Sequence, residues 1–220
     1  VIFYQAGKYD TAVDLITKAL AIKPDLAEAH YNLGIVLQAL VKLEDAVASY
    51  RKALDLKPDY PDAHNNLGSV LKGLGKLEEA VTSYQNALTL KPDYAEAHNN
   101  LGAVLQELGK LEEALMQHRR AIALKPYYAE AHYNLGNVLH KLQKHHEAIA
   151  SYEKVIQINP NYASAHYNLG NVLGALGEFQ QAINCYQKAI KSKHNYVLAY
   201  NNMLFTLLYF EVADPKFYIS

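Results

Sequence analysis

The sequence predicts an all-α solenoid in which antiparallel helix pairs stack one upon the next. The first observation is an internal repeat. The segment Ala-Glu-Ala-His-Tyr-Asn-Leu-Gly at residues 27–34 returns four times in similar form, always 34 residues further on, with a fainter copy at 197–204. A fixed period of 20–50 residues is typical of solenoids and repeat arrays. The other two observations are the helical spacing of apolar residues within each unit and the proline or glycine where each helix should end.

The repeat divides the chain into an array over residues 1–204 and a C-terminal junction segment over 205–220. Each unit is too small to bury its own apolar faces, so we expect neighbouring units to supply the core. The chain opens at Val1 in the middle of a unit, and we expect it to be a fragment. The expected units are a partial one at 1–26, five full ones at 27–60, 61–94, 95–128, 129–162 and 163–196, and a partial one at 197–204.

Two helices are expected in every full unit. In the first, His30, Leu33, Gly34 and Leu37 follow the spacing i, i+3, i+4, i+7 and therefore share one helix face. A second helix shows the same periodicity. Small residues should let the paired helices approach closely. The residues that define the second helix are Leu43, Ala46, Val47, Tyr50, Ala53 and Leu54.

The turn between the two helices has a recurrent slot for a residue in the left-handed conformation. Glycine, which suits this conformation, fills it in three units. Val41 and Gln143 stand there in two others and should adopt it less comfortably. A proline then follows the second helix of most units and should stop it, because proline lacks the N–H and clashes with the preceding turn. The glycines are Gly75, Gly109 and Gly177, and the prolines are Pro58, Pro92, Pro126 and Pro160.

This alternation of small and large residues resembles the tetratricopeptide repeat (TPR) over residues 1–204. The resemblance implies a right-handed superhelix whose first helices line an inner concave groove. Two single departures from the family pattern are His118, in place of the aromatic residue of the second helix, and Val155, in place of its late alanine. Histidine also replaces the usual tryptophan, at His30, His64, His98, His132 and His166.

An asparagine recurs on the first helices, on a stripe rotated about 100° or more from the core leucines. Asparagine costs a helix roughly half a kcal/mol relative to alanine, so its recurrence needs a reason. Its amide offers one acceptor and two donors. It could therefore pair with both groups of a peptide unit and hold an extended polypeptide without reading its side chains. The alternative is that each asparagine bonds to backbone or to its neighbour and orders the stack. These residues are Asn32, Asn66, Asn100, Asn134, Asn168 and Asn202.

No residue pattern indicates catalysis, a cofactor or a metal. The five regular histidines are expected to be packed and hydrogen-bonded. His140, His145 and His146 straddle a turn and lack the ligand spacing of helical zinc sites. Cys185 has no basic neighbour in the sequence and is expected to be an inert thiol. Phosphate loops, nucleophile elbows and paired catalytic carboxylates are not found, so we expect no enzyme activity in this segment.

The composition of the chain limits the classes of partner that it is expected to bind. The net charge is −1 and the isoelectric point about 6.9, which argues against binding to nucleic acid or to a membrane surface. No apolar stretch approaches the ~18 residues of a membrane span. A single cysteine excludes a disulfide framework and is compatible with a reducing compartment, so we expect a cytoplasmic protein. Protein or peptide ligands remain.

The junction after the last full unit reads Leu-Ala-Tyr-Asn-Asn-Met-Leu-Phe-Thr-Leu-Leu-Tyr-Phe at residues 198–210. This stretch is similar to the one that follows the last TPR in O-linked N-acetylglucosaminyltransferase-like proteins of the SPINDLY type and their bacterial relatives. The resemblance implies that the segment recruits acceptor substrates for a glycosyltransferase, although none of that family's catalytic residues falls within this chain. An alternative is a stand-alone or self-assembling scaffold that associates through its repeat ends, suggested by Val1–Tyr4 and the apolar Met203–Phe210.

Overall fold

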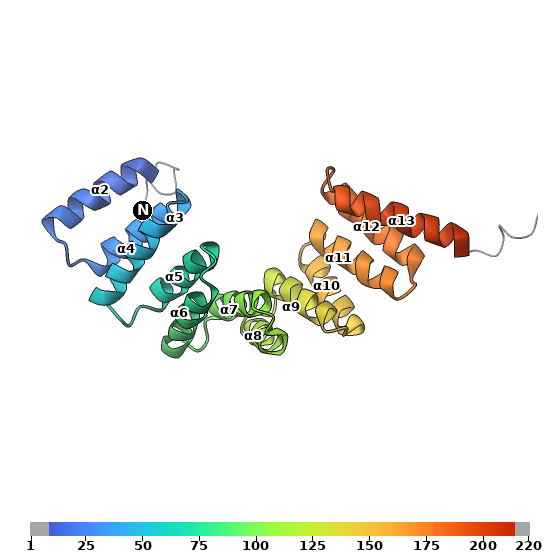
Figure 1. The fold of residues 1–220 in the computed structure, drawn as a ribbon, viewed down its shortest axis with the longest axis horizontal. Coiled ribbons are helices and arrows are strands. Elements are labelled where there is room, and N and C mark those ends of the chain that lie inside the picture. Colours follow the sequence, from blue (N-terminus) through green and yellow to red (C-terminus); the bar gives the residue numbers. More distant parts are fainter. Residues whose placement is uncertain (1–8, 214–220) are drawn as a thin grey trace, which may run out of the picture. The chain divides into compact units, whose positions relative to one another are not determined.

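The computed structural model describes residues 9–213, and these residues form twelve α-helices and no strand. The helices, labelled in Figure 1, belong to two compact units, Val1–Lys110 and Leu111–Ser220. The first contains α2 (Tyr9–Ile22), α3 (Ala27–Ala39), α4 (Leu43–Leu56), α5 (Pro61–Gly73), α6 (Leu77–Leu90) and α7 (Ala95–Glu107). The second contains α8 (Leu111–Leu124), α9 (Ala129–Lys141), α10 (His145–Ile158), α11 (Ala163–Ala175), α12 (Phe179–Ser192) and α13 (Val197–Ala213).

Each full 34-residue unit of the sequence contains a 13-residue helix followed by a 14-residue helix, as α3 and α4 illustrate. Within each compact unit, every helix packs against the next one along the chain, which gives an all-α solenoid, as predicted. The segment Val1–Tyr4 and the chain beyond Ala213 lie outside the described residues. None of the helices described is long and apolar enough to cross a membrane.

The core alternates small and large residues as predicted. Tyr50 in α4 and Tyr152 in α10 are almost completely buried, and each ring lies against a glycine of the preceding helix. A Cβ atom added at Gly34 would lie 2.6 Å from Tyr50 Cε1, and one at Gly136 would lie 2.6 Å from Tyr152 Cε1. These distances are shorter than any normal carbon–carbon contact, so glycine is the residue that allows the tyrosine to enter.

The helix ends partly follow the proline signal. The second helices end at Leu56 and Ile158, two residues before a proline in each case. However, α12 ends at the equivalent residue, Ser192, although His194 stands in the proline slot. Proline is therefore compatible with the end of the helix but is not required for it.

The turn between paired helices adopts the left-handed conformation whether or not it contains glycine. The backbone angle φ is 73° at Gly75, 59° at Val41 and 60° at Gln143, so the last two residues adopt the left-handed conformation that the equivalent glycines predicted. Val41 is 77 % exposed, so its side chain has little packing to lose.

We expect Val41→Gly to raise the free energy of unfolding by about 1 kcal/mol, because a left-handed conformation costs a side chain with a Cβ roughly 1–2 kcal/mol and glycine adopts it freely. Urea denaturation followed by circular dichroism measures the change. Ala48→Gly, at an exposed position inside α4, is the control and should lower stability by about 1 kcal/mol. A destabilised Val41→Gly variant would contradict the prediction.

Candidate functional site

The six asparagines lie on the first helix of successive repeats, and all are half-buried. In the second compact unit, the amides of Asn168 and Asn202 are each fixed by two hydrogen bonds to the preceding repeat. Asn168 Nδ2 donates to Tyr133 Oη (3.1 Å) and to Asn137 Oδ1 (2.8 Å). Asn202 Nδ2 makes the same bonds to Tyr167 Oη (3.1 Å) and Asn171 Oδ1 (2.8 Å). Both amide hydrogens are therefore used, while the Oδ1 atoms have no partner among the residues described.

The asparagines that receive these bonds connect the stripe to the core. Asn137 Oδ1 also accepts a hydrogen bond from the buried Tyr152 hydroxyl (2.9 Å), and Asn171 Oδ1 accepts one from Tyr186 (3.0 Å). Burial raises the pKa of Tyr152 above its usual value, with a further increase from Tyr133, so the hydroxyl stays protonated and donates. Tyr152 and Tyr186, whose rings pack against Gly136 and Gly170, thus also orient Asn137 and Asn171.

The first compact unit uses the same positions with different partners. Asn66 Nδ2 donates to Tyr31 Oη (3.1 Å), whereas Asn100 Nδ2 donates to Asn65 Oδ1 (3.1 Å). The residue directly before each stripe asparagine is always tyrosine or asparagine, and either one supplies an oxygen that can accept a hydrogen bond from the next repeat. Asn32 makes no hydrogen bond within the described part of the chain. Asn134 holds the corresponding place in α9.

The sequence left two roles open for the asparagine stripe, peptide binding and ordering of the stack. The hydrogen bonds assign the amide nitrogen to contacts between repeats and, at Asn168 and Asn202, leave the amide oxygen for a ligand. At Asn66, Asn100, Asn168 and Asn202 the donor end bonds to the preceding repeat, which is the kind of bond that the structural alternative requires. Peptide binding stays a prediction, and in the second unit it falls to the acceptor oxygen alone. The sequence analysis did not identify the hydrogen-bond partners of these asparagines. The pattern that could have indicated them is that only tyrosine or asparagine stands directly before each stripe asparagine.

We expect Asn168→Ala to lower the free energy of unfolding by roughly 1–3 kcal/mol, since it removes two hydrogen bonds worth about 1 kcal/mol each and leaves Asn137 Oδ1 with a single donor. Guanidinium denaturation measures this. Asn86→Ala provides the control, because Asn86 is exposed on α6 and makes no side-chain hydrogen bond within the described residues. Equal stability of the two variants would show that the bonds between repeats do not order the stack.

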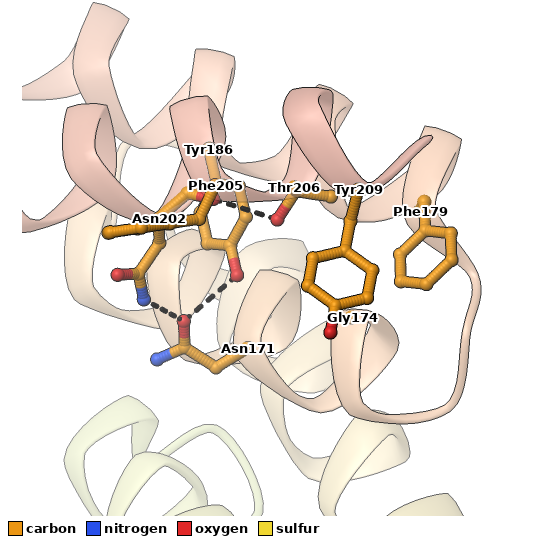
Figure 2. A pocket seen from close by; sticks show the side chains of 8 residues that line it. All are labelled: Asn171, Gly174, Phe179, Tyr186, Asn202, Phe205, Thr206 and Tyr209. Carbon is orange, nitrogen blue, oxygen red and sulfur yellow. Dashed lines mark hydrogen bonds between the residues drawn. The ribbon is translucent and has the colours of Figure 1, made fainter. Parts of the chain in front are cut away.

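A pocket lies where this stripe meets the last described helix. It measures about 330 Å³ and is bounded by α11, α12 and α13 (Figure 2). Phe205 is 68 % exposed and Tyr209 72 % exposed, so both rings stand open beside it. The lining residues are Asn171, Gly174, Phe179, Tyr186, Asn202, Phe205, Thr206 and Tyr209. The sequence indicated an apolar tail here but gave no indication of a pocket.

Comparison with known families decides the identity of the repeats. A TPR repeat model matches residues 2–41, 42–75, 71–109, 106–143 and 136–177, and a tetratricopeptide repeat model matches 163–196. The chain belongs to the TPR family. No curated protein sequence matches it significantly.

Several solved TPR structures are similar to this chain. YrrB, described as a TPR protein with an unusual peptide-binding site, is 27 % identical, with 84 % of this chain and 96 % of YrrB covered and a TM-score of 0.70. MamA is 27 % identical, with 75 % of this chain and 96 % of MamA covered and a TM-score of 0.69. PilF of Pseudomonas aeruginosa is 22 % identical with 90 % of each chain covered, and its TM-score of 0.80 reflects a shared fold. TPR repeats are a non-catalytic fold that generally forms protein-interaction scaffolds.

The histidines that replace the TPR tryptophan are hydrogen-bonded, as predicted. In each case the ring Nε2–H donates to a carbonyl oxygen six residues upstream, such as Pro24 O for His30 (2.8 Å) and Pro160 O for His166 (2.9 Å). The same bond is made by His64, His98 and His132. The histidine therefore ties the first helix of one unit to the proline that follows the second helix of the preceding unit.

Other candidates show no reactive arrangement. The rings of His140 and His145 lie 5.5 Å apart, and burial together with His145 lowers the pKa of His140. Among residues 9–213, no group of three or more histidine, cysteine or acidic side chains could hold a metal ion. Burial has the largest effect on the pKa of the half-buried Cys185 thiol and raises it, which favours the unreactive protonated form. The expectation that Cys185 has no basic neighbour was wrong, because Lys188 lies close enough to lower this pKa, to a smaller extent.

Proposed function

We propose that this TPR chain is a peptide-binding module that holds extended polypeptide along the stripe asparagines of a compact unit. The observation that carries the proposal is the pair of acceptor atoms, Asn168 Oδ1 and Asn202 Oδ1, at equivalent places in successive repeats. Each is fixed by two hydrogen bonds from its own Nδ2. An acceptor that is already oriented accepts a peptide N–H with little further loss of conformational entropy.

The TPR fold and the likeness to YrrB support the proposal, since that protein of 27 % identity is described as having a peptide-binding site. An asparagine Oδ1 atom can accept a hydrogen bond from a main-chain N–H group, and every residue of a polypeptide except proline has one. Binding of this kind is tolerant of sequence, and the side chains of the ligand contribute specificity only where pockets receive them.

The experiment changes the ligand and leaves the protein intact. A phage-displayed library of random 12-residue peptides is selected on the whole chain, and the best peptide is then resynthesised with one N-methyl group at each position in turn. We expect two or more N-methyl positions to weaken binding at least about fivefold, because each loses a hydrogen bond worth about 1 kcal/mol. A uniform response would contradict the acceptor role, and a library without binders would contradict peptide binding.

A finer proposal is that the module recruits acceptor substrates for a glycosyltransferase of the O-linked N-acetylglucosamine type. Its support is the resemblance of residues 198–210, which α13 contains. Translation of the coding sequence beyond Ser220 is the test. A glycosyltransferase region would support the proposal, and a stop codon or further repeats would contradict it. Cytoplasmic placement belongs to the same proposal and is tested by fractionation.

The second candidate is a self-associating scaffold, favoured by exposed apolar side chains on α13. Leu204 is 57 % exposed, Phe205 68 % and Leu208 52 %. If copies associate through this helix, light scattering will show a mass that rises with concentration. A constant monomeric mass would count against this candidate and leave the peptide-binding proposal unaffected.

A further inference from the structure

The pocket bounded by α11, α12 and α13 carries a main-chain recognition pair on one wall. Asn171 Oδ1 accepts hydrogen bonds from Tyr186 (3.0 Å) and Asn202 (2.8 Å). The Asn171 Nδ2 group makes no hydrogen bond to any of the described residues. Asn202 Nδ2 donates both of its hydrogens, and Asn202 Oδ1 accepts no hydrogen bond from the described residues. One open donor and one open acceptor, on side chains bonded to each other, match the C=O and N–H of a peptide main chain.

The opposite wall is aromatic. The rings of Phe179 and Tyr209 lie 6.5 Å apart between centroids and are tilted by 41°. Figure 2 shows these two rings on one side of Tyr186 and the two asparagines on the other. Aromatic rings attract further rings in tilted or offset geometry, with centroids 4.5–7 Å apart. None of the lining residues is acidic or basic, so a charged side chain would lose hydration here without gaining a partner.

The other repeats cannot form this pocket, because of what stands in the slot of Gly174. The equivalent residues have long side chains: Gln38, Lys72, Gln106 and His140. A Cβ at Gly174 would meet only Tyr186 Oη at 3.8 Å and Ala182 Cβ at 3.9 Å, which are ordinary contacts. Packing therefore does not require glycine at position 174. Because glycine has no side chain, space remains beside the Tyr186 hydroxyl.

The aromatic wall is also confined to this repeat. Tyr209 stands where other units have Ala39, Gly73, Glu107, Lys141 and Ala175, and Phe205 stands where they have Ile35, Ser69, Ala103, Asn137 and Asn171. The last repeat thus departs from the pattern at both positions that border the pocket.

We infer that this pocket binds one aromatic side chain of a polypeptide ligand, with the main chain on either side of that residue bonded to Asn171 Nδ2 and Asn202 Oδ1. The inference rests on the proposed function and supplies its specificity. The asparagine stripe holds any extended chain, and the pocket selects the register that places phenylalanine, tyrosine or tryptophan at α13.

A minimal probe tests the pocket separately from the stripe. N-acetyl-L-phenylalanine methylamide contains one aromatic side chain flanked by the two peptide groups, and it is titrated into the whole isotope-labelled chain by NMR. We expect saturable shifts of the Asn171 and Asn202 side-chain amides and of the Gly174 and Thr206 backbone amides, with a dissociation constant on the order of millimolar. The alanine and glutamate analogues should leave these signals unchanged.

The matched variant is Gly174→Gln, which places in the pocket the side chain that two other repeats carry. It should weaken the phenylalanine probe more than tenfold and keep the helix, since glutamine favours a helix over glycine. Gly174→Ala should retain most of the binding. Gly73→Gln, the same replacement in the first compact unit, is the control and should leave binding unchanged.

The outcomes separate the two proposals. Shifts elsewhere in the protein, equal binding of the alanine analogue, or an unaffected Gly174→Gln variant would overturn the aromatic assignment. If library peptides bind with affinities that Gly174→Gln does not change, the pocket inference fails and the peptide-binding function stands. If the probe enters the pocket but no library peptide binds, the stripe fails as a binding surface.

Discussion

Gly136→Leu is expected to lower the free energy of unfolding by about 3 kcal/mol, one of the two largest effects expected in this protein. The ring of Tyr152 leaves no space for a side chain at position 136, since even a Cβ atom would lie 2.6 Å from Tyr152 Cε1 and 2.9 Å from Cδ1. Tyr152 is 1 % exposed and cannot swing into solvent without opening the interface between α9 and α10. Overpacking of this kind typically costs 1–3 kcal/mol. Thermal and urea denaturation measure it.

Two companion variants identify the cause. Gly174→Ala adds a methyl group at a helical glycine with open space and should raise stability by up to about 1 kcal/mol. The double variant Gly136→Leu/Tyr152→Ala exchanges the large and small residues, so the two changes should be strongly non-additive and the double variant should recover part of the loss. Additive effects would mean that the two positions do not share one packing site.

The repeat made most of the fold predictable. Recurrence at 34 residues averages out local ambiguity: a helix boundary that is uncertain in one unit is read five times. Small residues were expected to let the paired helices approach, whereas the contact between Gly34 and Tyr50 was found only in the structure. The left-handed turn at Val41 was predicted from glycine at the equivalent slot of other units.

The candidate site was less predictable because it depends on contacts between repeats. Helical spacing placed Asn168 and Asn202 on one stripe, yet spacing cannot show whether an amide is already bonded. Their partners lie 31 and 35 residues upstream on the preceding first helix. The pocket depends on Gly174, and a glycine near the end of a helix looks like an ordinary breaker in a sequence. Its role became evident only when neighbouring helices showed that nothing fills the space.

A second large effect is expected from His118, which occupies the slot that holds tyrosine in four other units, at Tyr50, Tyr84, Tyr152 and Tyr186. The side chain is fully buried, and this burial lowers the pKa of His118 to about 4 from its usual 6.5. The unfolded chain binds a proton at this residue below pH 6.5, whereas the folded chain does not until about pH 4. Stability is therefore unaffected above pH 6.5 and falls as the pH decreases through this window.

Between pH 7 and pH 5 this single group is expected to lower the free energy of unfolding by roughly 2 kcal/mol, since each pKa unit corresponds to 1.36 kcal/mol. Other histidines and carboxylates also titrate, so the measurement is a comparison of denaturation midpoints at both pH values for the parent chain and His118→Tyr. Tyrosine suits this slot elsewhere and does not ionise in the window. The variant should lose about 2 kcal/mol less than the parent on acidification, whatever its stability at pH 7. Equal losses would show that His118 gains its proton in the folded chain as readily as in the unfolded one, so that its burial would not be maintained in solution.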